Sequence, residues 1–293
     1  MYDAEPTTTH AAMASPWLSE SAFVSGLNAV HDRGYVIIEN AMSLEDCRQY
    51  RDELERHMAQ SPRGRNVFEG TSSHRLYALL AKSETFAAMI EHPLALAFAE
   101  HFLGESCLLS ACLSINLHPG ESVQPWHTDD AHIGVAHPHG IFGVSVFWAL
   151  DETTVLNGAT EVLPYSHRWA DSELQGMLQG MLQDEHFTQT ETVGEDSHGA
   201  LDSVHAAMPA GSIMIMRSDV WHRGGANRSE TDRLIVTPQY CAGWARQLEN
   251  MLLAVPAERA RVLPKRTQEL LGYSIHTPFM GYVDGMHPSR VLK

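Results

Sequence analysis

The chain has 293 residues, of which 44% are hydrophobic, and this length suffices for one large domain with a substantial core. Acidic residues outnumber basic ones by 36 to 20, and the basic residues are scattered rather than gathered into a stripe. This balance argues against binding to nucleic acid or to anionic membranes and favours a small-molecule partner.

The cysteines and the first residues of the chain predict a cytoplasmic protein. Cys47, Cys107, Cys112 and Cys241 contain no CxxC pair and suggest no disulfide framework, so we expect reduced thiols. Residues 1–16 lack a basic start and an apolar stretch, and no run of about 18 apolar residues occurs anywhere. We expect residues 1–16 to be flexible and the protein to be a monomer or a homodimer.

Residues 17–106 are predicted to be mainly helical. Two helical faces are indicated by apolar residues at three- and four-residue spacing: Phe23, Leu27 and Val30 in the first, and Leu44, Cys47, Leu54 and Met58 in the second. Gly34 is well placed to end the first helix, and Ser43 to begin the second. A short strand is expected between them at 35–39, and helical character continues through roughly residues 84–103.

From residue 107 to 242 the pattern changes to short apolar runs separated by Gly, Pro and Asn. The runs are 107–117, 141–150, 159–163, 212–217 and 233–240. Several short strands with turns between them predict a sandwich or barrel of the jelly-roll kind, so the fold class is mainly β with flanking helices (α+β). Residues 171–200, with the near-repeat LQGMLQGMLQ, are expected to form a surface insertion. Residues 243–293 are expected to add helices at 244–253 and 256–271, followed by an irregular tail.

A histidine and a carboxylate lie close together in the segment QPWHTDD. The chain has 18 histidines, so a single histidine carries little information, but His127 and Asp129 are two residues apart. In a strand, residues i and i+2 point to the same face, so one nitrogen and one oxygen ligand would converge while Thr128 points away. The sequence therefore predicts two neighbouring metal ligands here.

A third ligand is expected from a distant strand that the fold brings alongside. The best candidate is His222 in the segment DVWHRGGANR. Two histidines and one carboxylate form the facial triad of non-haem iron oxygenases, which leaves positions open for a bidentate 2-oxo acid and for O2. A closed tetrahedral zinc site would leave none. We therefore expect Fe(II) to be bound by His127, Asp129 and His222.

The far carboxylate of a 2-oxo acid needs a cationic partner. Arg233 opens the apolar run RLIVT eleven residues after His222. Its planar guanidinium can make two charge-assisted hydrogen bonds to a carboxylate. The alternative is an exposed arginine at a strand edge that pairs with Asp232 or Glu230.

Three longer segments stand in order along the chain: QPWHTDD, WALDETTVLNGATEVLPYSHRW and GSIMIMRSDVWHRGGANRSETDRLIV. Together they resemble the phytanoyl-CoA dioxygenase family, and the resemblance covers nearly the whole chain. It implies a double-stranded β-helix of cupin-like jelly-roll type, with Fe(II) held by His127, Asp129 and His222 and 2-oxoglutarate held by Arg233. The tail LLGYSIHTPFMGYVDGMHP is similar to that of bacterial members assigned to secondary metabolism.

The resemblance also implies further contacts to 2-oxoglutarate. Asn116, Gln124 and Thr160 lie in or beside strands at positions that often contact this cofactor in the family, although hydrogen bonding within turns explains Asn and Thr equally well. The remaining histidines near these segments are expected to lie in loops and not to bind metal: His118, His132, His137, His139 and His167.

The expected function is oxidation of an unactivated C–H bond of a small molecule, a secondary metabolite, most simply by hydroxylation. Desaturation, epoxidation and rearrangement start from the same oxidant. Halogenation is disfavoured because Asp129 stands where related halogenases have a small residue. Two alternatives stay open: a zinc or manganese jelly-roll hydrolase or isomerase, and a non-catalytic metal-containing ligand-binding protein.

Overall fold

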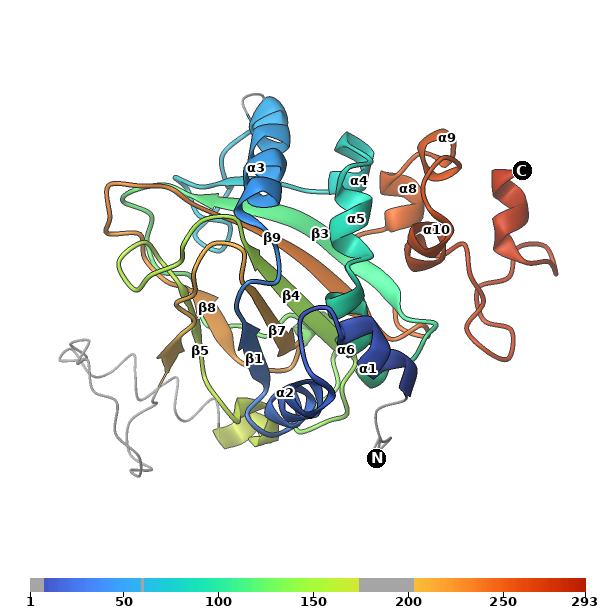
Figure 1. The fold of residues 1–293 in the computed structure, drawn as a ribbon, viewed down its shortest axis with the longest axis horizontal. Helices are drawn as coiled ribbons and strands as arrows, with labels where there is room; N and C mark the ends of the chain where they lie inside the picture. The colour runs from blue at the N-terminus through green and yellow to red at the C-terminus, as the bar shows by residue number, and fades with distance from the viewer. Residues whose placement is uncertain (1–7, 59–60, 174–202) are drawn as a thin grey trace.

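The computed structural model describes residues 8–58, 61–173 and 203–293, and within these ranges its centre is a six-stranded antiparallel sheet (Figure 1). The sheet order is β1-β7-β4-β9-β3-β2. Its strands are β1 (Tyr35–Ile38), β2 (His74–Leu76), β3 (Leu108–Leu117), β4 (Gly143–Ala149), β7 (Ile213–Arg217) and β9 (Arg233–Cys241). The first half of the chain thus supplies both edge strands, and the long strands β3 and β9 pair near the middle.

A smaller sheet packs against the inner face of the large one. Its order is β6-β5-β8, formed by β6 (Val204–His205), β5 (Thr160–Val162) and β8 (His222–Gly224). Alternation along β4 separates two hydrophobic cores, because successive side chains point to opposite faces. Val146 and Trp148 pack with the helices, whereas Phe147 packs with Val162 of the small sheet.

Helices cover the outer face of the large sheet (Figure 1). The α-helices are α1 (Thr8–Ala14), α2 (Glu20–Asp32), α3 (Leu44–Met58), α4 (Leu79–Lys82), α5 (Phe86–Ile90), α6 (Pro93–Leu103), α8 (Met251–Ala254), α9 (Ala257–Ala260) and α10 (Lys265–Leu271). Three 3-10 helices are η1 (Ala131–Ile133), η2 (Ser166–Arg168) and η3 (Pro288–Leu292). α6 packs on β4 and α10 on β3, so helices from both ends of the chain support the sheet.

The predicted start of the fold is confirmed in detail. Helix α2 begins after Ser19, whose hydroxyl accepts a hydrogen bond from the Ala22 amide. The helix ends before Gly34, which has a φ of 98°. That left-handed conformation favours glycine and turns the chain directly into β1.

Other segments differ from the sequence-based expectation. Residues 8–14, which we expected to be flexible, form α1, which buries His10 and Ala14 and packs against α6. The predicted helix at 244–253 is reduced to α8, and the one at 256–271 is split into α9 and α10. Pro264 precedes α10 and cannot donate the amide that one continuous helix would need. The predicted insertion at 171–200 lies outside the described residues except for 171–173.

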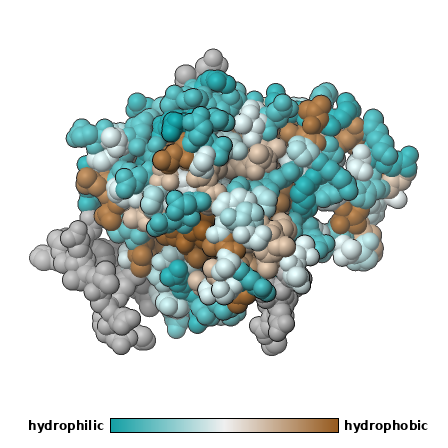
Figure 2. Space-filling model, viewed as in Figure 1, coloured by the Kyte–Doolittle hydropathy of each residue, from teal (hydrophilic) through white to brown (hydrophobic). Residues whose placement is uncertain are grey.

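The described part of the chain has no helix long and apolar enough to span a membrane. All four cysteines are buried and unpaired. Figure 2 shows a face dominated by hydrophilic residues, with hydrophobic residues gathered near its middle.

Candidate active site

A cavity of about 500 Å³ lies inside the fold and is lined by both sheets. The long strands contribute alternate side chains to its wall: Ala111, Leu113, Ile115 and Leu117 from β3, and Arg233, Ile235, Thr237 and Gln239 from β9. This alternation follows from the pleat of the strands. It also explains how a charged side chain can face inward from an otherwise apolar strand.

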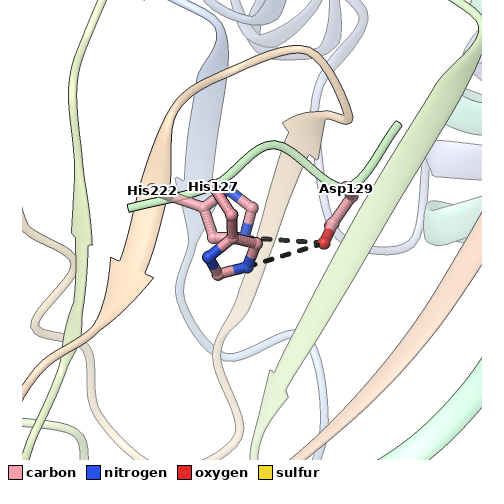
Figure 3. A group of neighbouring side chains, drawn as sticks. All are labelled: His127, Asp129 and His222. Atoms are coloured by element: carbon pink, nitrogen blue, oxygen red, sulfur yellow. Dashed lines mark ion pairs between the residues drawn. The ribbon is translucent and has the colours of Figure 1, made fainter. Parts of the chain in front are cut away.

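Three candidate metal ligands meet at this cavity (Figure 3). Asp129 Oδ1 lies 4.0 Å from His127 Nε2 and 3.7 Å from His222 Nε2. The sequence suggested that His127 and Asp129 lie in one strand. In the structure His127 is outside any regular strand, and Asp129 lies in a turn. His127 instead forms an isolated β-bridge with His222, through amide–carbonyl hydrogen bonds of 3.0 and 2.9 Å. The backbone pairing of two distant segments therefore brings the candidate ligands together.

The two imidazoles are oriented in the same way. His127 Nδ1 lies 3.0 Å from the Pro125 carbonyl oxygen, and His222 Nδ1 lies 3.0 Å from the Val220 carbonyl oxygen. A carbonyl can only accept, so each Nδ1 carries the proton and each Nε2 keeps its lone pair. Such outer hydrogen bonds are the usual way in which proteins fix metal-binding histidines.

The carboxylate is oriented by a serine. Ser145 on β4 donates a hydrogen bond to Asp129 Oδ2, which leaves Oδ1 directed at the two imidazoles. Burial lowers the pKa of His127 to about 4, and the nearby His222 acts in the same direction. His127 is therefore neutral near pH 7, as a metal ligand must be. The three donors fit a divalent metal of the non-haem iron type.

Arg233 lies in the same cavity and lacks a carboxylate partner among the described residues. It is only 2% exposed, and one Nη donates to the Gly158 carbonyl oxygen at 2.7 Å, while Nε has no partner in the described part of the chain. Burial lowers its pKa to about 10, and the positive charge of Arg75 adds to this effect. Asp232, the partner in the alternative interpretation, instead pairs with His118. An unpaired buried guanidinium fits an anionic ligand.

Two of the three other residues predicted to contact 2-oxoglutarate lie at the cavity, and the third does not. Thr160 and Gln124 line the cavity. The Gln124 amide links two backbones, donating to the Phe68 carbonyl oxygen and accepting from the Gly224 amide. Asn116 lies outside this group, because even-numbered residues of β3 face away from the cavity, and its amide donates to Asp232.

The part of the cavity wall formed by β2 and the segment before it was missed by sequence reasoning. Arg75, on β2, is partly buried and reaches the cavity wall, where it donates hydrogen bonds to the Phe68 and Glu69 carbonyl oxygens. The ring of Phe68 lies 4.8 Å from that of His127. No sequence signal could have found these residues, since β2 has three residues and an arginine in a short polar segment is normally solvated.

The chain is similar to several known proteins. A family model described as phytanoyl-CoA dioxygenase (PhyH) matches residues 30–235. Dioxygenase af480 of Aspergillus fumigatus is 27% identical over 259 residues, covering 86% of this chain and 76% of the relative. Dioxygenase cnsJ of Penicillium expansum is 26% identical over 294 residues, covering 91% of this chain and 81% of the relative.

Solved structures are similar in fold. The non-heme alpha ketoglutarate dependent epimerase SnoN from nogalamycin biosynthesis aligns with a TM-score of 0.59 at 19% identity, covering 76% of this chain and 83% of that one. The carbocyclase SnoK from the same biosynthesis aligns with a TM-score of 0.56 at 16% identity, covering 82% of this chain and 87% of that one. At this level of identity the likeness concerns the fold, and it confirms the predicted jelly roll.

Proposed function

The chain belongs to the phytanoyl-CoA dioxygenase family, and from this premise we propose that it oxidises an unactivated C–H bond of a largely apolar small molecule, most simply by hydroxylation. As a member of this family it is an iron- and 2-oxoglutarate-dependent dioxygenase. The finer statements about ligands, substrate and outcome rest on its own residues. The observation that carries them is a cavity that holds three preoriented metal donors and one buried, unpaired arginine.

In this proposal His127, Asp129 and His222 hold Fe(II) through Nε2, Oδ1 and Nε2. The hydrogen bonds to Pro125, Val220 and Ser145 keep these atoms aimed at one point. Iron held there supplies, with O2 and 2-oxoglutarate, the oxidising chemistry that releases succinate and carbon dioxide. The protein's own contribution is to fix the donor geometry and to limit the access of water.

Arg233 is proposed to bind the far carboxylate of 2-oxoglutarate. Its Nε has no hydrogen-bond partner among the described residues, and one Nη donates only to the Gly158 carbonyl oxygen, so the guanidinium forms no ion pair with a described carboxylate. Two parallel charge-assisted hydrogen bonds would satisfy the buried cation. Thr160, on the cavity wall, offers a hydroxyl for the same carboxylate.

The rim of the cavity indicates the substrate class. Four large hydrophobic residues on its wall are also exposed to solvent: Val67 (59%), Phe68 (43%), Tyr77 (40%) and Leu248 (51%). Exposed apolar residues around a concave site favour an apolar ligand. Together with the wall carboxylates Glu69, Glu121 and Glu249, this rim argues against a highly anionic substrate such as an acyl-CoA. The likeness to enzymes from nogalamycin biosynthesis supports a secondary metabolite.

Other outcomes and other functions are less well supported. Desaturation, epoxidation or rearrangement would need the same site, whereas halogenation would need the space that Asp129 occupies. A zinc or manganese hydrolase or isomerase would leave Arg233 without a ligand. Neither alternative agrees with the family's requirement for 2-oxoglutarate.

An anaerobic titration of metal-free protein with Fe(II) and 2-oxoglutarate tests the proposal without knowledge of the substrate. We expect the weak visible charge-transfer band of chelated iron in the wild type. The band should require much more 2-oxoglutarate in Arg233→Ala and be unchanged in the control Arg48→Ala, since Arg48 lies on the surface and pairs with Glu45. Tight binding of zinc or manganese without any band would overturn the proposal.

A further inference from the structure

A second group of metal-type donors lies in the segment that follows Asp129. Asp130, His137 and His139 bring one carboxylate and two imidazoles within 4.8 Å of one another. Their side chains are 3%, 8% and 6% exposed. Asp130 Oδ2 lies 3.9 Å from His139 Nε2, which matches the 3.7 and 4.0 Å between donors in the first triad.

The donor atoms of two members of this group have no hydrogen-bond partner in the described residues. Both carboxylate oxygens of Asp130 and Nε2 of His137 are buried and have no hydrogen-bond partner in the described part of the chain. Buried polar atoms are nearly always satisfied, because an unpaired one loses its hydration without compensation. An unpaired buried carboxylate next to an unpaired imidazole nitrogen therefore indicates a ligand that accepts electron pairs from both.

The outer hydrogen bonds repeat those of the first triad. His137 Nδ1 lies 2.9 Å from Asp171 Oδ1, and His139 Nδ1 lies 2.7 Å from the Gly140 carbonyl oxygen. Both acceptors place the proton on Nδ1, so each Nε2 keeps its lone pair on the side of Asp130. The pair of His137 and Asp171 is the carboxylate–histidine arrangement that commonly orients metal ligands.

Two buried carboxylates lie near these histidines, Asp130 and Asp219, and only Asp219 is paired with an arginine. Asp219 lies close by, 3.9 Å from His139 Nδ1, but it accepts two hydrogen bonds from Arg217 at 2.8 and 2.6 Å. Arg217 thus compensates Asp219 and leaves Asp130 without a cation of its own among the described residues. Asp219 is therefore not available as a metal ligand, and the candidate ligands are Asp130, His137 and His139.

We propose that Asp130, His137 and His139 form a second metal site, separate from the iron triad, which binds a divalent cation of the zinc type. Two nitrogen donors and one oxygen donor suit Zn²⁺, with water in the fourth position. The bound cation fixes residues 130–140 against the sheet and so supports the backbone that presents Asp129. The prediction from sequence that His137 and His139 do not bind metal would then be wrong, because the loop HPHG aims both rings at one carboxylate.

Metal stoichiometry tests this site independently of the proposed function. Metal-free protein is dialysed against Zn²⁺ at increasing concentration, and bound zinc is measured by mass spectrometry. We expect two equivalents in the wild type and in the control His31→Ala, since His31 is exposed on the protein surface. We expect one equivalent in His137→Ala/His139→Ala and one in His127→Ala/His222→Ala. If the iron triad does not bind zinc, His127→Ala/His222→Ala will bind as much zinc as the wild type. If the new site does not bind zinc, His137→Ala/His139→Ala will bind as much zinc as the wild type.

The isosteric variant Asp130→Asn can still test the site if the histidine variants fold poorly. If a cation binds, the substitution removes a ligand, lowers zinc occupancy and lowers the melting temperature of the zinc-loaded protein. Without a cation, the same substitution removes an unpaired buried charge and should raise the melting temperature. The same zinc content in the wild type and in His137→Ala/His139→Ala, or a more stable Asp130→Asn protein in the presence of zinc, would overturn the proposal.

Discussion

Single hydrogen bonds decide which atoms of the active site are available to a metal. Ser145 donates to Asp129 Oδ2 and thereby directs Oδ1 at the imidazoles. We expect Ser145→Ala to weaken Fe(II) binding about 10- to 100-fold, the usual effect of removing a hydrogen bond to a metal ligand. Ser114→Ala is the matched control, because Ser114 is equally buried but its hydroxyl has no partner in the described residues. Equal affinities in the two variants, measured by anaerobic dialysis, would contradict this role of Ser145.

The shape of the Arg233 side chain matters as well as its charge. Arg233→Lys keeps a cation in the cavity but loses the planar fork and leaves the Gly158 carbonyl oxygen without its present donor. We expect the Kd for 2-oxoglutarate to rise at least about 30-fold, which corresponds to about 2 kcal/mol. Calorimetry on the Fe(II)-loaded or Zn²⁺-loaded protein measures it. A change below about threefold would show that charge alone binds the cofactor.

At the residue scale, the sequence singled out residues that lie together in the structure, but it did not predict the backbone that carries them. His127, Asp129, His222 and Arg233 do gather at one cavity. The spacing argument assumed a strand at 127–129, whereas the pairing of His127 with His222 is a single bridge. Asn116 was misplaced because its orientation depends on the register of a strand, and one residue of register exchanges the two faces.

The turn between α2 and β1 depends on Gly34. A Cβ at this position would lie 2.3 Å from a methyl carbon of Val220, in a backbone with φ of 98°. Gly104 has a similar φ of 84°, but a Cβ there would have no atom within 4 Å. Both alanine variants should lose about 1–3 kcal/mol of unfolding free energy to backbone strain, and Gly34→Ala should lose about 1–3 kcal/mol more to overpacking. Urea denaturation of the pair separates the two terms, and equal losses would contradict the steric argument.

The docking of α6 is expected to depend on pH through His92. The His92 ring lies between those of Trp17 and Trp148, at 4.4 and 4.8 Å, and burial lowers its pKa to about 4. The unfolded chain binds this proton near pH 6.5, so the neutral folded form is fully favoured above that pH and loses stability as pH falls from about 6.5 towards 4. The loss between pH 7 and 5 should be about 1–2 kcal/mol.

The variant His92→Gln removes this titration. Its unfolding free energy should therefore fall less than that of the wild type between pH 7 and 5, by about 1–2 kcal/mol. His31→Gln, which replaces an exposed histidine in the same way, is the control for the substitution itself. Denaturation of all three proteins at both pH values measures the difference, and parallel curves for His92→Gln and the wild type would contradict the assignment.

At the scale of elements, segments with a local apolar pattern were predictable, and segments without one were not. The apolar face of α2 and the runs of β3, β4, β7 and β9 are local signals, and they appear as predicted. The face of α3 also appears, except that Leu44 at its start is 58% exposed. β2, β6 and β8 have two or three residues each and exist only because a neighbouring strand pairs with them. The same dependence on tertiary packing explains α1, whose short apolar face is stabilised by α6 rather than by its own sequence.

The architecture of the whole molecule follows from two cores that share one sheet. Side chains of β4 alternate between a core under the helices and a core between the two sheets. Removing either the helices or the small sheet would therefore expose apolar side chains of β4 to water. Apolar runs interrupted by turns predicted the jelly roll. The cavity could not be predicted in the same way. It is the space left between side chains of β3, β9 and residues 67–77, which are far apart in the sequence.

The net charge of −16 should act on the molecule as a whole. Repulsion among unpaired surface carboxylates opposes the compact state, and it extends over about 30 Å at 0.01 M salt but only about 8 Å at 0.15 M. Raising NaCl across this range should therefore stabilise the fold by on the order of 1 kcal/mol, or about 2–4 °C in melting temperature. The gain should shrink near the isoelectric point of about 5.5, where the repulsion is small. Scanning calorimetry at pH 7.5 and 5.5 distinguishes this effect from specific ion binding, because a gain of equal size at both pH values would mean that chloride or sodium acts at a site and not through the net charge.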